Sequence, residues 1–526
     1  MTSTTRNHHD ATGRSALVRN VLSSWGGHTI LVVAGFILPR MIDREMGQAA
    51  LGIWDFCWSL VSYFGITQIG VGASVNSFVA RHRTARDVEL LNRVVSSAMA
   101  VQLVAGMLVF LWTLLSAYFL PTFFPDRFGD LLNETRWVVV LLGSGLAIQI
   151  ALDSFGNVIT GCHRWDIHNA IHAGFYGATV TGMIVSLLLG GGLRSLALAS
   201  MCGTVLAELT RVVMTYRICP ELSLRLRFVS WDTTRGMLAF GGKVVLGGLS
   251  LLLIYQTTSV FIVAYLGPGS LALYARAMAL VRHCSIFVEK FASILTPTAS
   301  SLDAMGERSK LQTFLLETAG YSAFMVLPPI LFLAILGGPV LQVWMGPQYA
   351  QGEVLTVLAL GHLMSIANTP LWTILRGIDK HGWPALVRFG AAACVALFAW
   401  LMLSRLSPNL MGAALAVTIP LTLFEGIYLP WYATQQFNIS TTRYAQRVWG
   451  LPLLCVLPFA MTLLGVRAMY LEQPSIALMA GMILGGLVLG VVYWHRVVPL
   501  SLRESIWRKL LGSPQSAAQP LHVSKN

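Results

Sequence analysis

Three basic side chains recur at seven-residue intervals in one apolar run, namely Arg276, His283 and Lys290. Seven residues make almost two turns of an α-helix, so these side chains would follow one face over about 20 Å. Such a row of cations suits an anionic ligand such as a diphosphate, which it would bind by charge-assisted hydrogen bonds. A simpler interpretation places Arg276 and Lys290 near the two ends of a membrane helix, where both reach the polar headgroups.

Further polar residues lie in the same run and in two others. Arg282 and Glu289 are also seven residues apart and form a second stripe. Asp55 is either part of a substrate site or a buried acid paired with Arg276 or Arg40. Gln256 belongs to a polar segment that could bind sugar or another helix. The candidate substrate-binding residues are therefore Arg276, His283, Lys290, Asp55, Arg282, Glu289 and Gln256.

Three acids inside apolar runs are candidates for ion coupling. A charge at the centre of a bilayer costs about 2.5–3.5 kcal/mol on insertion scales, so each acid needs a partner, a water-filled cavity or a function. Asp153 shares one helix face with Gln149 and Asn157. Glu208 precedes Arg211 by three residues, a spacing that favours a structural ion pair. Glu425 has no cation nearby in the sequence.

The composition indicates the elements that must position these residues. Only 11% of the 526 residues are charged and 55% are apolar, whereas soluble chains are about a quarter charged. Apolar runs of about 20 residues recur and predict an all-α polytopic membrane protein of about 14 transmembrane helices. The seven cysteines show no metal-ligand spacing, so free thiols, no metal and no cofactor are expected.

The net charge of +13 is explained by topology better than by nucleic-acid binding, because no soluble basic domain remains outside the apolar runs. Of the 36 Lys and Arg residues, 23 fall on one set of alternating connections and 7 on the other. Cations are retained on the cytoplasmic side, so both termini are expected there. The basic amphipathic tail at 502–511 is expected to lie on anionic phospholipids.

The sequence repeats itself at an offset of about 220 residues. Met46-Gly47 and the residues that follow align without a gap on Leu266-Gly267 and its successors, and at an offset of 217 Glu208 falls on Glu425. We therefore expect two pseudo-symmetric six-helix halves plus two C-terminal helices. The expected segments are a cytoplasmic N-terminus at 1–19, halves at 20–216 and 238–435, a basic linker at 217–237, extra helices at 446–495 and a cytoplasmic tail at 496–526.

Several short motifs resemble those of the polysaccharide transporter family, within the superfamily of multidrug, oligosaccharidyl-lipid and polysaccharide exporters. The motifs are Ile37-Leu38-Pro39-Arg40, Met46-Gly47 with its echo Leu266-Gly267, Gly161-Cys162-His163-Arg164 and Leu375-Arg376-Gly377.

The resemblance implies an inner-membrane flippase that moves a polyprenyl-diphosphate-linked oligosaccharide by alternating access, for exopolysaccharide or O-antigen synthesis. It also implies a central cavity lined by the first, second, seventh and eighth of the expected helices, near 20–40, 49–74, 238–265 and 270–298. Asp55 would then lie opposite the basic stripe. Contact with polymerase or export machinery is a further implication.

Two other function classes are open. A cation-coupled multidrug exporter would share the architecture, but a lipophilic cation favours an acidic, aromatic cavity over one that holds Arg276 and Lys290. A membrane enzyme that polymerises or ligates lipid-linked sugars would hold its chemistry in a long outer loop. The longest outer connections, near 121–136 and 338–353, carry no convergent acid and base.

Overall fold

The computed structural model describes residues 14–65 and 87–498, with isolated positions between 72 and 83 and at 500, 503 and 504. Within these, the side chains of residues 14–28 and 238–247 are not described. Twelve helices of the described part are long and apolar enough to cross a membrane. The helix α1 (Arg14–Phe64) is not among these twelve and consists of two helical segments joined by a turn at Gly47. The chain is therefore a polytopic all-α membrane protein, as the sequence predicts.

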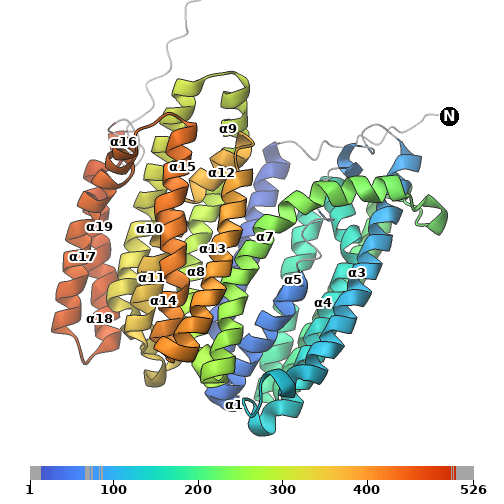
Figure 1. The fold of residues 1–526 in the computed structure, drawn as a ribbon, viewed down its shortest axis with the longest axis horizontal. Helices are drawn as coiled ribbons and strands as arrows, with labels where there is room; N and C mark the ends of the chain where they lie inside the picture. Colours follow the sequence, from blue (N-terminus) through green and yellow to red (C-terminus); the bar gives the residue numbers. More distant parts are fainter. Residues whose placement is uncertain are drawn as a thin grey trace, which may run out of the picture.

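The helices fall into two groups and a C-terminal addition (Figure 1). The first group is α1, α3 (Val88–Phe123), α4 (Leu132–Gly161), α5 (Trp165–Leu188) and α6 (Leu193–Ile218). The second group is α7 (Trp231–Leu266), α8 (Pro268–Ser293), α9 (Leu295–Ala304), α10 (Arg308–Met345), α11 (Gly352–Ala367), α12 (Thr369–Gly377), α13 (Gly382–Leu401), α14 (Leu410–Leu421) and α15 (Leu429–Gln436). The addition is α16 (Thr441–Ala445), α17 (Leu451–Met469), α18 (Pro474–Ala480) and α19 (Gly486–Arg496).

Short 3₁₀ and π-helical turns join or interrupt these helices. The 3₁₀ turns are η2 (Gly129–Leu131), η3 (Leu226–Phe228) and η4 (Pro347–Tyr349). The π-helical turns are η5 (Met402–Leu406), η6 (Thr422–Tyr428), η7 (Gln446–Gly450) and η8 (Gly481–Gly485). In the described part, the two helices expected near 20–40 and 49–74 form one element, α1, which is broken only at Gly47. Most of the expected continuation from 66 to 74 lies outside the described residues.

Two matching turns support the internal repeat. Gly47 has φ 84° and ψ 167°, and Gly267 has φ 87° and ψ 168°. Only glycine adopts these angles without strain, which explains why both turns carry it. The turns also touch, because a Cβ on Gly52 would lie 1.7 Å from the Pro268 carbonyl oxygen. Gln48 Nε2 donates to the Gly269 carbonyl at 2.9 Å across the same contact.

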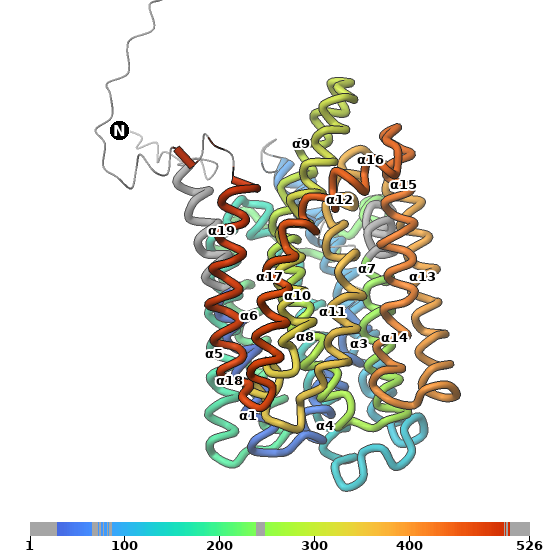
Figure 2. Tube along the Cα trace, turned by 90° about the vertical axis from the view of Figure 1, so that its left-hand side faces the viewer, coloured from blue at the N-terminus to red at the C-terminus, as the bar shows by residue number. Residues whose placement is uncertain are grey.

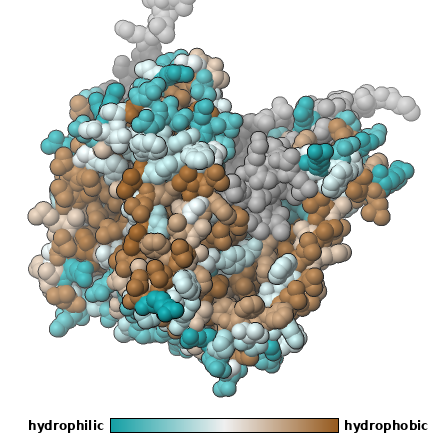
Figure 3. All heavy atoms as spheres, in the orientation of Figure 1, coloured by the Kyte–Doolittle hydropathy of each residue, from teal (hydrophilic) through white to brown (hydrophobic). Residues whose placement is uncertain are grey.

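The two groups lean together at the end of the molecule that holds these turns, which we call the Gly47 side. Their ribbons diverge toward the opposite end, which holds α9, α16 and the connection from α6 to α7 and which we call the linker side (Figure 1). The added helices α17 to α19 pack against α10 on the outside of the second group (Figure 2). Apolar side chains form a broad belt between the polar ends, as expected for a surface in contact with lipid (Figure 3).

Candidate substrate-binding site

A cavity of about 270 Å³ lies between the two groups, bounded by α1, α7 and α8. Its lining combines hydroxyl, amide, aromatic and guanidinium groups, which suit a ligand that carries sugars and an anion. Four of the candidate residues from the sequence line the cavity: Asp55, Gln256, Arg276 and Arg282. The lining residues are Asp55, Trp58, Ser59, Ser62, Tyr255, Gln256, Ser259, Leu271, Tyr274, Ala275, Arg276, Met278, Ala279 and Arg282.

Arg276 and Asp55 form a buried ion pair across the two groups. One Arg276 nitrogen, Nη2, lies 2.7 Å from each carboxylate oxygen of Asp55. The Arg276 side chain is only 8% exposed and that of Asp55 16% exposed. Of the two interpretations of Asp55, the structure therefore shows the acid paired with Arg276. The pair occupies the wall of the cavity, and each charge neutralises the other.

Arg282 is the exposed cation of the cavity. Its guanidinium lies 5.9 Å from the centre of the Tyr255 ring, within cation–π range. Within the described part of the chain, Arg282 forms no ion pair. Arg282 follows Ala275 by seven residues, so both lie on one face of α8. The small side chains of Ala275 and Ala279 on this face leave space for the cavity. One member of each stripe, Arg276 and Arg282, thus lines the cavity, and of these two only Arg282 is exposed.

The other members of the two stripes lie outside the cavity lining. His283 stacks on Phe36 of α1, with ring centres 5.3 Å apart. Lys290 is exposed toward the linker-side end of α8. Glu289 is exposed and accepts a hydrogen bond from Ser285 Oγ at 2.8 Å. The stripe of Arg276, His283 and Lys290 therefore faces α1 through its first two members instead of forming one continuous row of free cations.

A cluster of polar contacts closes the Gly47 side, which we call the latch. Tyr349 donates a hydrogen bond from its hydroxyl to Asp43 Oδ1 at 2.6 Å, and Gln348 donates to Asp43 Oδ2 at 3.3 Å. Trp344 Nε1 donates to the Phe36 carbonyl at 2.8 Å, and Arg40 donates to the carbonyls of residues 343 and 344. Burial and the neighbouring Asp43 carboxylate raise the pKa of the Tyr349 hydroxyl, which therefore stays protonated and donates.

We predict that Tyr349→Phe opens the Gly47 side, because it removes the strongest donor to Asp43. The measurement is labelling of Ser59→Cys in the cavity by a membrane-impermeant thiol reagent on intact cells, with the exposed Cys202 and Cys394 replaced by alanine. Labelling is expected to rise several-fold over that of the chain with Tyr349 intact. Tyr321→Phe, at an exposed position of α10, is the matched control. Equal labelling of both variants would rule out a closing role for the latch.

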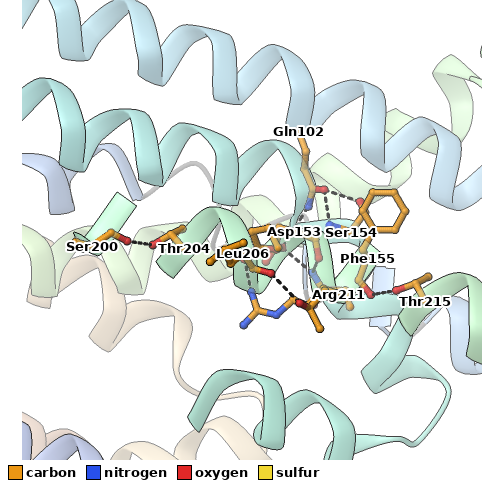
Figure 4. A network of polar contacts seen from close by, with 12 residues as sticks. Gln102, Asp153, Ser154, Phe155, Ser200, Thr204, Leu206, Arg211 and Thr215 are labelled. Carbon is orange, nitrogen blue, oxygen red and sulfur yellow. Dashed lines mark hydrogen bonds and ion pairs between the residues drawn. The ribbon is translucent and has the colours of Figure 1, made fainter. Parts of the chain in front are cut away.

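A polar network lies inside the first group, away from the central cavity (Figure 4). Gln102 Nε2 donates to Asp153 Oδ2 at 3.3 Å, and Gln102 Oε1 accepts from the Ser154 backbone N–H at 2.8 Å. Asn157 Nδ2 donates to Asp153 Oδ2 at 2.6 Å. Asp153 is thus held between α3 and its own helix α4. The polar face expected from the sequence is turned into the first group.

Glu208 borders a second cavity, of about 390 Å³, between α1, α4, α5 and α6. Its Oε1 pairs with Arg211 one turn along α6, as the spacing predicts. Its Oε2 is buried and has no hydrogen-bond partner among the described residues. His172 and Tyr176 of α5 line the same cavity with their rings stacked. Glu208 therefore keeps one buried carboxylate oxygen without a hydrogen-bond partner at the edge of this cavity.

Glu425, at the equivalent position of the second group, is differently placed. Arg388 of α13 lies 3.0 Å from its Oε1, and Trp372 Nε1 donates to its Oε2 at 3.0 Å. The carboxylate is fully buried, in the π-helical turn η6. The sequence offered no partner for this acid, because Arg388 and Trp372 come from other helices. Arg388 also lies 4.9 Å from the centre of the Trp372 ring.

Sequence patterns alone did not single out every residue of the site, above all its aromatic side chains. Trp58 and Tyr274 line the central cavity, but in an apolar run an aromatic residue is indistinguishable from one that packs in a core. Asp43 and Tyr349 are 306 positions apart, so their contact depends on how the helices pack. No group of three His, Cys, Asp or Glu side chains within the described ranges could hold a metal ion.

The sequence profile of a family described as polysaccharide biosynthesis proteins matches residues 59–352, more than half of the chain. The membrane protein EpsK of Bacillus subtilis is 24% identical over 411 residues, which are 76% of this chain and 79% of EpsK. A protein of Shigella flexneri whose name describes an O-antigen transporter is 20% identical over 439 residues, which are 81% of this chain and 99% of that protein.

Solved structures share the fold at low sequence identity. An inward-facing multidrug transporter superposes with a TM-score of 0.61 at 17% identity, covering 82% of this chain and 96% of its own. A Pyrococcus furiosus transporter, described as having a binding pocket of reverse polarity, superposes with a TM-score of 0.60 at 15% identity, covering 80% and 95%. The chain belongs to this family of polysaccharide biosynthesis proteins, it is a transporter and not an enzyme, and it shares its fold with the solved multidrug-type transporters.

Proposed function

We propose that the chain moves a polyprenyl-diphosphate-linked oligosaccharide across the bacterial inner membrane, from the cytoplasmic to the outer face. The observation that carries the proposal is the central cavity, where Arg282 is exposed and forms no ion pair with a described residue. A guanidinium binds phosphate oxygens in a two-pronged geometry that neutral side chains do not provide. Ser59, Ser62 and Gln256 offer hydrogen bonds that sugar hydroxyls require.

The movement we propose is alternating access between two halves, residues 20–216 and 238–435, joined by the linker at 217–237. The helices at 446–495 are added to the outside of the second half. The latch then holds the Gly47 side closed, and Asp55 and Arg276 form the next contact inward. The positive-inside bias of the sequence supports a cytoplasmic position for the linker side and both termini. Substrate would enter while the Gly47 side is closed.

For ion coupling, Glu208 is better placed than Asp153 or Glu425. A coupling group needs room for an ion and an oxygen that is free to bind it. Glu208 borders a cavity and has an unpartnered Oε2. Glu425 is ion-paired with Arg388 through Oε1 and accepts from Trp372 through Oε2, and it lines neither the central cavity nor the second cavity. Asp153 accepts from Gln102 and Asn157. We therefore propose Glu208 as the residue that binds the coupling cation or proton.

The test is a deletion strain complemented with the intact chain or with Arg282→Gln. We expect deletion to abolish surface polysaccharide and to cause lipid-linked saccharide to accumulate on the cytoplasmic face. Arg282→Gln is expected to lower export at least about tenfold, since it removes the free cation of the cavity. Arg405→Gln removes the same charge at an exposed position away from the cavity and is the matched control.

A multidrug exporter predicts a different set of results. In that case the deletion strain would become sensitive to lipophilic cations without accumulating lipid-linked saccharide. Arg282→Gln would then improve export of a cationic drug, because it would remove like-charge repulsion in the cavity. Either result would overturn the proposed function.

A further inference from the structure

We propose that the connection between α6 and α7 is a binding surface for anionic phospholipid headgroups. The surface, which we call the linker surface, consists of Arg225, Leu226, Arg227 and Trp231. Leu226 is 90% exposed and Trp231 is 73% exposed, although both are large apolar side chains. Both arginines beside them are exposed as well. Exposed apolar and cationic side chains in alternation suit the boundary between lipid tails and phosphates.

The opposite side of the same segment is fixed to the first group of helices. Ser223 N donates to Asn92 Oδ1 at 2.7 Å, and Ser230 N donates to Ser97 Oγ at 3.0 Å. Cys219, Leu222 and Met237 are buried against residues of α3 and α4. The exposure of Leu226 and Trp231 is therefore not the result of a loose segment. The backbone is tied down on one side and presents these side chains on the other.

The level of the segment along α3 matches the headgroup layer. The helix α3 has 36 residues, which span about 54 Å, whereas the hydrocarbon core is about 30 Å thick. Its first turns therefore extend beyond the hydrocarbon, and the linker is bonded to residues 92–97 in those turns. Further along, α3 exposes Met107, Leu111 and other apolar side chains, as a lipid-facing helix does. The linker surface thus lies at the rim of the bundle, beside lipid (Figure 1).

The charges of the surface select an anionic partner. Arg225 and Arg227 have no acidic side chain paired with them in the described part of the chain. Of the nearby acids, Glu221 lies 3.5 Å from Arg83, and the exposed Asp232 beside Trp231 forms no ion pair with Arg225 or Arg227. Arg227 lies 5.0 Å from the centre of the Phe228 ring, which supports the guanidinium from one face and leaves its edge open. Phosphate groups of acidic lipids fit these open edges, while Leu226 and Trp231 enter the acyl boundary.

Bound lipid would act on the start of α7. This helix packs against α3 near its beginning and against α13 further along, so it joins the two groups. Headgroups bound at the linker surface would hold the beginning of α7 at the membrane surface beside the first group. This inference concerns a site separate from the central cavity and does not depend on the transported substrate.

The test uses the full chain in nanodiscs of phosphatidylglycerol and phosphatidylcholine, with bromine on the acyl chains of one lipid at a time. The fluorescence of Trp231 is obtained as the difference between the intact chain and Trp231→Phe. We expect brominated phosphatidylglycerol to quench this difference signal several-fold more than brominated phosphatidylcholine. The preference is expected to disappear in Arg225→Gln/Arg227→Gln, whose substitutions lie on the exposed surface and leave the fold intact.

The matched control is Arg308→Gln/Lys310→Gln, which removes two cations from the same side, in the exposed first turn of α10. This control should keep the preference. A count of retained phosphatidylglycerol by native mass spectrometry provides a second measurement, and it should fall only in the linker variant. Equal quenching by both lipids would overturn the proposal. A Trp231 signal that neither lipid quenches would overturn it too, and would indicate a protein partner instead.

Discussion

Arg276→Gln is expected to reduce the folded amount of the protein and to abolish export, and so is Asp55→Asn. Each change leaves the other member of a buried ion pair without its partner. Breaking a buried pair on one side typically costs about 3–5 kcal/mol, because an uncompensated charge remains in a low-dielectric site. The measurements are detergent-extracted folded protein by size-exclusion chromatography and surface polysaccharide in a complemented deletion strain.

The double variant Asp55→Asn/Arg276→Gln separates two explanations for such a loss. Removing both charges leaves two neutral polar side chains of similar shape, and such replacements are often tolerated. If the pair only ties α1 to α8, the double variant should recover both folding and export. We expect this result, because both oxygens of Asp55 already engage the Arg276 guanidinium, which is 8% exposed.

Recovery of folding without export would show that Arg276 itself binds the substrate, as the seven-residue stripe in the sequence predicts. Comparison with Arg282→Gln then assigns the headgroup contact to one of the two arginines. That variant is expected to fold normally and to fail in export alone, because Arg282 is exposed and forms no ion pair with a described residue. The two arginines thus give different combinations of stability and export.

Local features of this chain could be predicted from the sequence, and contacts between helices could not. Gly47 and Gly267 stand at equivalent places of a repeat, and each forms the same turn. Glu208 and Arg211 pair because they are one turn apart on one helix. The stripe of Arg276, His283 and Lys290 is also a matter of helix period. Its direction depends on how α8 is rotated against its neighbours, and periodicity alone does not set this rotation.

The partners of buried charges show the same limit. Asp55 and Arg276 are 221 positions apart, and their contact depends on how α1 and α8 pack. Glu425 had no visible partner because Arg388 lies on a different helix. The sequence did indicate that each of these charges needs a partner, since an isolated charge in an apolar run is costly. The sequence thus identified the charges that need a partner, whereas the partner of each charge depends on how the helices pack.

The equivalent acids Glu208 and Glu425 are expected to respond differently to neutralisation. Glu425→Gln should keep export above about half of the original level, because the carboxylate is already neutralised by Arg388 and a glutamine oxygen still accepts from Trp372. Glu208→Gln should reduce export per folded molecule at least about tenfold, because it removes the charge of the carboxylate that borders the cavity. The folded amount should fall as well, because Arg211 loses its partner. The measurements are export and folded protein, as for Asp55 and Arg276.

The control for Glu425 is the removal of its partner. Arg388→Gln leaves a carboxylate that is 1% exposed with only the Trp372 donor, so we expect a large loss of folded protein. Glu425→Gln leaves Arg388, which is 16% exposed and lies against the Trp372 ring, so the loss should be small. If Glu425→Gln folds normally but abolishes export, the second group carries the coupling carboxylate, and the assignment of coupling to Glu208 is wrong. Equal loss of folded protein in both single variants would show that the ion pair stabilises the arginine as much as the acid.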